Sequence, residues 1–319
     1  MDCAIQAEAL TKVYRETSAT PVKALDGLNL RVRQGEIFGL LGRNGAGKTT
    51  LLRILTTLLR PTAGSASVMG FDVMRRALDV RKHICVVLQE NAVELYLSVE
   101  DNLSTYARFH SIPPREISRR AEQSMDQFAL TEHRRQKVID LSGGMKRRVQ
   151  VAKVFMVDKP VVFLDEATTG MDPINKRATL DAIRAQARAG RTIFLTTHIL
   201  QEAEELCDRI AIVDHGRTVA EGDLPTIKSL SSEVFDMTIT FDQITPAVLA
   251  DLRRLPVLSL TQKQNTVQLS IKGKAGPAVE ILSRLSASAT ILHFELTSAS
   301  LEDVFLELLS STPPGKGNA

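Results

Sequence analysis

The chain has 319 residues, 44% of them hydrophobic and 24% charged, with 40 Lys and Arg against 37 Asp and Glu. This composition excludes wholesale disorder and a collagen-like fibre, and the near-neutral charge gives no reason to expect nucleic acid as a partner. Three distant cysteines and the lack of a run of about 18 apolar residues predict a cytoplasmic chain without a membrane span. The first ten residues include Asp2 and Glu8, so we expect no signal peptide there.

Strand-like and helix-like patterns alternate over most of the chain and predict an α/β fold. Apolar runs predict strands at 36–41, 84–88, 161–164, 192–196 and 210–213, and helical periodicity covers 49–59, 178–189 and 200–207. Strands that are apolar on both faces are typical of a parallel sheet covered by helices. The turn-rich run 222–225 predicts a domain boundary, so we expect a first domain over residues 1–228.

A small α+β domain is predicted over residues 229–311. Alternating apolar residues predict strands near 237–241, 257–260, 267–271 and 292–296, with helices at 246–255 and 276–287. The order β-α-β-β-α-β is that of a ferredoxin-like unit. A last helix at 300–309 opens with a capping signature of Ser300 and Asp303, and we expect the tail 312–319 to be disordered.

Residues 42–49 match the phosphate-loop pattern G-x4-G-K-[ST] between a predicted strand and a predicted helix. Glycines let backbone N–H groups converge on phosphate oxygens, and the start of the helix adds positive charge. Lys48 can reach the β- and γ-phosphates, and the Thr49 hydroxyl can bind Mg²⁺. The alternative is a plain glycine-rich turn. The candidate nucleotide-binding residues here are Gly42, Asn44, Gly45, Ala46, Gly47, Lys48, Thr49 and Thr50.

Two carboxylates, Asp165 and Glu166, follow the apolar run 161–164. Ligands bind at the carboxyl ends of parallel strands, so both side chains are expected near the phosphate loop. Asp165 has the chemistry of a Mg²⁺ ligand, and Glu166 could accept a proton from an attacking water. Such a run alone also fits an ordinary strand end, but after a phosphate loop it indicates a nucleotide hydrolase.

A Leu-Ser-Gly-Gly run at 141–144 opens another predicted helix and forms a second candidate anion site. The order of phosphate loop, Ser-Gly-Gly helix start and apolar-Asp-Glu strand resembles the nucleotide-binding domain of ABC transporters over about residues 4–228. Ser142, Gly143 and Gly144 resemble the signature motif of that family. The resemblance implies an ABC-type P-loop NTPase with a helical subdomain at about 90–155, and it implies ATP and Mg²⁺ as cofactors.

The same resemblance assigns roles to further residues. Gln89 resembles the Q-loop glutamine, His198 the switch histidine, Asp172 the acid of the D-loop, and Tyr14 the aromatic residue that stacks on adenine. It implies that the catalytic residues are Lys48, Gln89, Glu166 and His198, and that Mg²⁺ is held by Thr49, Gln89 and Asp165. Open alternatives are a half-buried strand position for Tyr14, a surface position for Gln89 and a strand-end position for His198. The chain departs from the family's frequent residues at Arg43, Met145 and Ala167, where no required group is lost.

One phosphate loop and one signature per chain imply, in this family, a homodimer in which the signature of one subunit closes on the ATP of the other. Segment 90–140 corresponds to the part of the family's helical subdomain that contacts a membrane subunit. The implied partner is therefore a separately encoded integral-membrane permease, with this chain peripheral on the cytoplasmic face of the membrane. The runs 168–173 and 301–306 resemble ATPase subunits of ABC-2-type, daunorubicin-resistance-type drug exporters.

The expected function is ATP hydrolysis that energises export of a drug, antibiotic, lipid or polysaccharide. One alternative is a soluble ABC ATPase that acts on ribosomes or nucleic acid, although the chain lacks a second nucleotide-binding domain and long coiled coils. The other is an importer ATPase, against which the Gly170-Met171-Asp172 form and the C-terminal domain argue. We expect the C-terminal domain to be an accessory or regulatory one.

Overall fold

The computed structural model describes residues 3–14, 21–89, 92–230, 234–245, 248, 252, 257, 259–272, 275–298 and 300–311. The chain divides into two units, Met1–Gly222 and Asp223–Ala319. The predicted tail 312–319 lies outside the described residues, as does the predicted helix 246–255 apart from residues 248 and 252.

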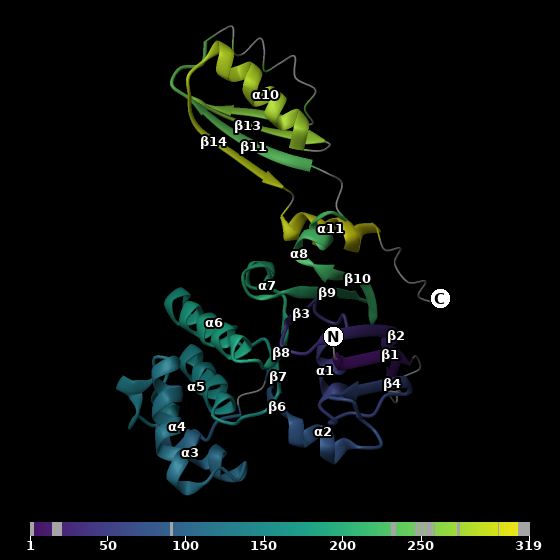
Figure 1. Ribbon diagram of the computed structural model, residues 1–319, viewed down its shortest axis with the longest axis vertical. Coiled ribbons are helices and arrows are strands. Elements are labelled where there is room, and N and C mark those ends of the chain that lie inside the picture. Colours follow the sequence, from purple (N-terminus) through teal and green to yellow (C-terminus); the bar gives the residue numbers. More distant parts are fainter. Residues whose placement is uncertain are drawn as a thin grey trace. The chain divides into compact units, whose positions relative to one another are not determined.

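The first unit holds two sheets and two groups of helices (Figure 1). Its elements in chain order are β1(Cys3–Tyr14), β2(Val22–Arg33), β3(Ile37–Leu41), α1(Lys48–Leu55), β4(Ala63–Val68), β5(Phe71–Asp72), α2(Ala77–His83), β6(Ile84–Val87), α3(Val99–Phe109), α4(Pro114–Gln127), η1(Thr131–His133), η2(Val138–Asp140), α5(Gly143–Phe155), β7(Val161–Asp165), α6(Pro173–Arg188), β8(Thr192–Thr197), α7(Leu200–Leu206), β9(Arg209–Asp214) and β10(Arg217–Asp223).

The central sheet has the strand order β10-β9-β3-β8-β7-β6, and its pairs from β9 to β6 are parallel. The predicted α/β class is confirmed, and every residue of β3 and β7 is buried, as a sheet covered on both faces requires. Helix α1 is shorter than the predicted 49–59. It ends at Leu55 because Thr57 adopts a left-handed backbone with φ +64°, and the Thr56 hydroxyl donates to the Leu52 carbonyl.

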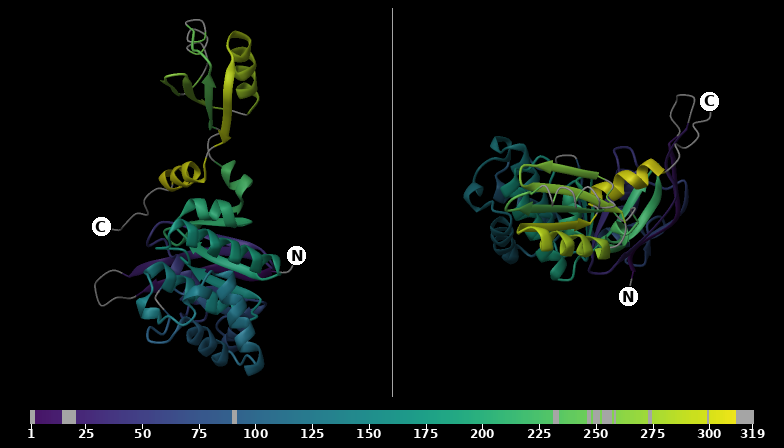
Figure 2. Two further views of the ribbon diagram at one scale, coloured as in Figure 1. Left: turned by 90° about the vertical axis from the view of Figure 1, so that its left-hand side faces the viewer. Right: turned by 90° about the horizontal axis from the view of Figure 1, so that it is seen from above.

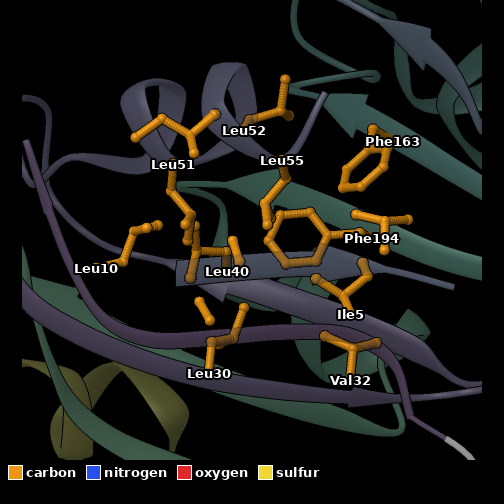
Figure 3. Packing of buried hydrophobic residues seen from close by; sticks show 14 of the residues in the cluster. Ile5, Leu10, Leu30, Val32, Leu40, Leu51, Leu52, Leu55, Phe163 and Phe194 are labelled. Carbon is orange, nitrogen blue, oxygen red and sulfur yellow. The ribbon is translucent and has the colours of Figure 1, made fainter. Parts of the chain in front are cut away.

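The apolar side chains of helix α1 pack against residues of both sheets in one buried cluster (Figure 3). The second sheet, in the order β2-β1-β4-β5, packs against the same cluster of fully buried side chains. Close packing of this kind leaves little freedom for the start of α1, which carries Lys48. The labelled residues of the cluster are Ile5, Leu10, Leu30, Val32, Leu40, Leu51, Leu52, Leu55, Phe163 and Phe194.

A group of helices, α3, α4 and α5, pack on one another, and α5 also contacts α6. The Ser98 hydroxyl accepts a hydrogen bond from the Asp101 amide at 3.0 Å and caps α3, and Pro114 is the first residue of α4. This group is the helical subdomain of the expected fold.

The second unit comprises α8(Leu224–Lys228), β11(Val234–Phe241), β12(Ser259–Lys263), β13(Thr266–Lys272), α10(Ala275–Ser288), β14(Ile291–Ser298) and α11(Leu301–Ser311). Its antiparallel sheet has the order β12-β13-β11-β14, which is the strand order of a ferredoxin-like unit. Helix α10 lies along one face of this sheet (Figure 2). The small α+β fold predicted here is confirmed.

Two details of this unit differ from the sequence pattern. The alternating pattern 292–296 begins with Leu292, yet this residue is 64% exposed, because the pairing shifts between Thr240 and Phe241 and leaves one extra residue in β14. The run 222–225 contains the start of α8, where the Asp223 carboxylate accepts from the Thr226 amide at 2.9 Å. The predicted cap of α11 is confirmed by reciprocal bonds between Ser300 and Asp303 of 3.0 and 3.2 Å.

Candidate active site

The loop between β3 and α1 can be built only with glycine at two positions. A Cβ atom on Gly42 would lie 2.4 Å from the Val213 carbonyl oxygen, and one on Gly47 would lie 2.4 Å from the Ala24 oxygen. Gly47 also has a φ of +104°, which side chains of L-residues rarely allow. The sequence motif therefore reflects a steric requirement of the backbone.

Lys48, the first residue of α1, folds back over this loop. Its Nζ donates to the Gly42 oxygen at 2.7 Å and to the Arg43 oxygen at 3.1 Å, and the residue is 7% exposed. Burial lowers the pKa of Lys48, against the opposite effect of the carboxylates of Glu166 and Asp165. A buried ammonium that is hydrogen-bonded only to neutral carbonyl groups is strongly stabilised when an anion binds beside it.

A hollow of about 350 Å³ lies in front of the loop. It brings together most of the residues predicted for nucleotide binding and catalysis, together with Ala24, which the sequence did not suggest. The predicted residues that line it are Asn44, Gly45, Gly47, Lys48, Thr49, Thr50, Gln89, Glu166 and His198.

Glu166 is held at the rim of the hollow by the two other polar residues predicted for catalysis. One carboxylate oxygen, Oε1, lies 2.9 Å from Nδ1 of His198, and the other, Oε2, accepts from Nε2 of Gln89 at 3.3 Å. Its backbone has a φ of +50°, and its amide donates to the Thr196 carbonyl at 3.1 Å. A left-handed non-glycine residue costs about 1–2 kcal/mol, so the surrounding contacts must hold Glu166 in this conformation.

Asp165 is 2% exposed, and its two carboxylate oxygens differ. Oδ1 accepts from the Thr196 hydroxyl at 2.5 Å, whereas Oδ2 has no hydrogen-bond partner among the described residues. Burial raises the pKa of Asp165, and the bond from Thr196 acts in the opposite direction. A buried carboxylate oxygen without a donor is suited to a cation.

Asp165 shares a second hollow of about 280 Å³ with Thr49 and Gln89, the other two residues predicted to bind Mg²⁺. Together they offer a carboxylate, a hydroxyl and an amide oxygen. Mg²⁺ prefers oxygen ligands and takes few of them from proteins. The residues present therefore fit this ion, and Thr49 and Gln89 also line the first hollow.

Several predicted site residues do not line the first hollow. The Tyr14 hydroxyl lies 3.5 Å from the Thr50 hydroxyl, and the Tyr14 ring faces the Lys12 ammonium at 5.3 Å. Gly42 and Ala46 form the base of the loop, where Ala46 is 4% exposed. These three lie near the phosphate loop but do not line the hollow in front of it.

The signature residues and Asp172 lie elsewhere. The Ser142 hydroxyl accepts from the Met145 amide at 3.3 Å and caps α5. Gly144 packs so closely that a Cβ atom there would lie 2.8 Å from the Gly170 oxygen. The Asp172 carboxylate caps α6 by accepting from the Asn175 amide at 3.0 Å, which lowers its pKa. Within one chain, the structure does not bring these residues, or Gly143, to the hollow that Lys48 lines.

Three residues near the site escaped the sequence analysis. Arg147 donates to the carbonyl oxygens of the segments that carry Gln89 and Glu166. Thr196 holds Asp165, as described above. Glu202 is 5% exposed and accepts from the hydroxyls of Thr168 at 2.7 Å and Thr197 at 3.3 Å. No short sequence pattern predicts any of these contacts. The one available hint is the charged run that follows the signature motif, because it places charged side chains on α5, a helix that packs against its neighbours.

The family model described as "ABC transporter" matches residues 25–169, and the one described as "ATP-binding protein DrrA1-3-like, C-terminal domain" matches residues 236–309. The chain is 42% identical over 228 residues to the daunorubicin resistance ATP-binding protein DrrA3 of Streptomyces coeruleorubidus, covering 72% of this chain and 71% of that protein. It is 37% identical over 312 residues to the daunorubicin/doxorubicin resistance ATP-binding protein DrrA of Streptomyces peucetius, covering 96% and 92%. The chain belongs to the ABC transporter family of ATP-binding proteins.

A solved structure of an ATP-binding subunit of an ABC transporter superposes with a TM-score of 0.64 at 27% identity, covering 71% of this chain and 92% of that one. The expected ABC-type fold and the expected ATPase are thereby confirmed. These two relatives carry the names of drug-resistance proteins, which supports an exporter ATPase and does not favour the ribosomal or importer alternatives.

Proposed function

We propose that this chain binds ATP across the first hollow and hydrolyses it with Glu166 as the base that activates water. The observation that carries the proposal is the geometry around Glu166. Its carboxylate is oriented by His198 and Gln89 at a hollow that Lys48 also lines. A carboxylate held in place by hydrogen bonds can accept a proton from a water beside it.

Lys48 and the amides of the loop would bind the β- and γ-phosphates, and Thr49, Gln89 and Asp165 would hold Mg²⁺. Bound there, Mg²⁺ neutralises phosphate charge and favours departure of the leaving group. Tyr14 would stack on the adenine, close to Thr50 on α1.

The catalytic site is completed, in our proposal, by a second copy of the chain. The signature residues Ser142, Gly143 and Gly144 stand at the start of a 13-residue helix, a geometry suited to an anion, yet they do not line the hollow of their own chain. A two-fold dimer would place them against the γ-phosphate held by the partner. Asp172, at the start of α6, would lie at the same interface.

The variant Glu166→Gln tests the base and the dimer together. We expect turnover to fall by at least about 100-fold, the usual contribution of a general base, while ATP-bound dimers accumulate. Turnover is measured by phosphate release, and dimers by sedimentation with and without Mg-ATP. Wild-type turnover in this variant would remove Glu166 from its role. The absence of ATP-dependent dimers in both proteins would remove the composite site.

We further propose that ATP hydrolysis energises an exporter through a separate integral-membrane permease. Among the described residues, no helix is long and apolar enough to cross a membrane. An exposed apolar patch on the helical subdomain, where the Ile139 amide bonds the Leu95 oxygen at 2.7 Å, is our candidate contact with this permease. The exposed residues of the patch are Leu95, Tyr96, Leu97 and Ile139.

Co-purification from membranes, followed by identification of the bound subunit, tests this attachment to the cytoplasmic face. Tyr96 is 76% exposed, so Tyr96→Glu should fold normally and release the chain from membranes. Equal recovery of both proteins with membranes would contradict the patch. We propose export of a drug, antibiotic, lipid or polysaccharide, and an accessory role for the second unit, with 1–228 as the nucleotide-binding domain.

A further inference from the structure

One face of helix α5 is joined to the segment that contains Gln89. Three long polar side chains, spaced three residues apart, reach this segment from the helix: Arg147, Gln150 and Lys153. Nη1 of Arg147 donates to the Leu88 oxygen at 2.5 Å and to the Gln89 oxygen at 3.3 Å. Nε2 of Gln150 donates to the Leu88 oxygen at 3.0 Å, and Nζ of Lys153 donates to the Ala92 oxygen.

Arg147 also reaches the residues at the end of β7. Its Nη2 donates to the carbonyl oxygen of Asp165 and, at 3.1 Å, to that of Glu166. The same guanidinium therefore bonds four carbonyl groups from two segments, each of which carries a residue of the proposed active site. The amide of Glu166 is bonded to the Thr196 oxygen at 3.1 Å, so hydrogen bonds hold Glu166 through both its amide and its carbonyl oxygen.

The burial of Arg147 indicates that this arrangement is specific. The residue is 5% exposed, and burial lowers its pKa, while the charges of Asp165 and Glu166 oppose that shift. A buried charge costs several kcal/mol unless it is well hydrogen-bonded. An apolar side chain could fill the same volume at lower cost, but it could not hold the left-handed Glu166 peptide and the Gln89 peptide in fixed positions.

We infer that Arg147 is a positioning residue for ATP hydrolysis, which fixes the peptide groups of Gln89 and Glu166 to the helix that begins at the signature. The inference rests on the proposed roles of Glu166 and of the signature. Ser142 caps the same helix that carries Arg147.

The test compares Arg147→Met and Arg147→Lys with Lys146→Met, which removes a neighbouring ammonium that bonds the Ile139 oxygen outside the site. Misplacement of a catalytic group by about 1 Å costs roughly 100-fold, so we expect kcat of Arg147→Met to fall roughly 10- to 100-fold. The KM for ATP should change less than about threefold, because the phosphate loop is untouched. Arg147→Lys keeps the positive charge but lacks the planar guanidinium that bonds several carbonyl groups at once, so this variant should have an intermediate kcat.

A double-mutant cycle separates positioning from general damage. Because Arg147 acts through Glu166, adding Arg147→Met to Glu166→Gln should lower the residual turnover by less than about threefold. Fully multiplicative losses, a KM that rises in parallel with the fall in kcat, or wild-type kcat in both Arg147 variants would overturn the inference. If Arg147→Met does not fold, Arg147→Lys alone decides by the same criteria. Wild-type turnover in Glu166→Gln would instead refute the proposed base, whatever the Arg147 variants show.

Discussion

Replacement of Thr196 by valine should destabilise the chain in a pH-dependent way. Valine keeps the shape of threonine but removes the hydroxyl that donates to Asp165 Oδ1 at 2.5 Å. Thr196 is 1% exposed and Asp165 2% exposed, so water cannot replace the lost donor. A hydrogen bond to a charged group contributes about 1.5–3 kcal/mol. For a unit of this size, that corresponds to a fall in the thermal midpoint of about 3–12 °C near pH 8.

The sign of the pH dependence follows from the pKa of Asp165. Burial holds that pKa above its ordinary value of 3.8, so the folded chain binds this proton more tightly than the unfolded chain. The contribution of Asp165 to stability therefore decreases as pH rises through the unfolded and then the folded pKa. Thr196→Val raises the folded pKa further. The difference in stability between variant and wild type should be largest above both folded pKa values and should shrink as pH falls through them and the carboxyl becomes protonated.

The matched control is Thr192→Val on the same strand. Thr192 is 2% exposed, and its hydroxyl accepts from the Gly35 amide at 2.9 Å, a bond between neutral groups. Thr192→Val should lower the free energy of unfolding by about 0.5–1.5 kcal/mol at every pH. The chain has no tryptophan, so unfolding is followed by far-ultraviolet circular dichroism without nucleotide or Mg²⁺. A Thr196→Val penalty that stays the same from pH 8 down to the lowest pH at which the chain is folded, or that does not exceed the control near pH 8, would refute the reasoning.

The signature helix and the cysteines give two further predictions. Gly144→Ala places a methyl group 2.8 Å from a backbone oxygen and should lower stability by about 1–3 kcal/mol, whereas Gly143→Ala meets nothing within 4 Å and should not; equal thermal midpoints would contradict this packing. Burial raises the pKa of Cys85 to about 12 and also that of Cys207. At pH 8 a thiol reagent should modify only the half-buried Cys3 rapidly in the folded chain and all three cysteines in denaturant, and rapid loss of all three thiols without denaturant would contradict their burial.

The parts of the site that could be predicted from sequence are those in which chemistry and chain position coincide. The phosphate loop is one such part, because its glycines are required by contacts with the backbone at Val213 and Ala24. The acids after β7 are another, because the apolar strand before them fixes the edge of the sheet where they emerge. Each motif could be placed at a strand end or a helix start from the residues within about ten positions of it, and hydrophobic periodicity predicted those strands and helices.

The contacts made by Arg147 could not be predicted in this way. They join Arg147 to carbonyl groups 18–59 positions away, and the bond from Gln150 to Leu88 spans 62 positions, so no local pattern records them. The bulge at Leu292 is similar, since alternation in one strand does not reveal a shift in its pairing with another. The early end of α1 at Leu55 reflects a single left-handed residue, Thr57, of a type that does not favour that conformation.

The two adjacent carboxylates at the end of β7 acquire different properties from one change in backbone geometry. Asp165 still belongs to the strand, so its side chain is buried beside Thr196 and shares the second hollow with Thr49 and Gln89. Glu166 turns to a φ of +50°, which brings its carboxylate to the first hollow and to His198. The first position suits a cation ligand and the second a proton acceptor. In the proposed function, the groups that hold this turn, Thr196 and Arg147, would therefore determine which acid binds the cation and which accepts the proton.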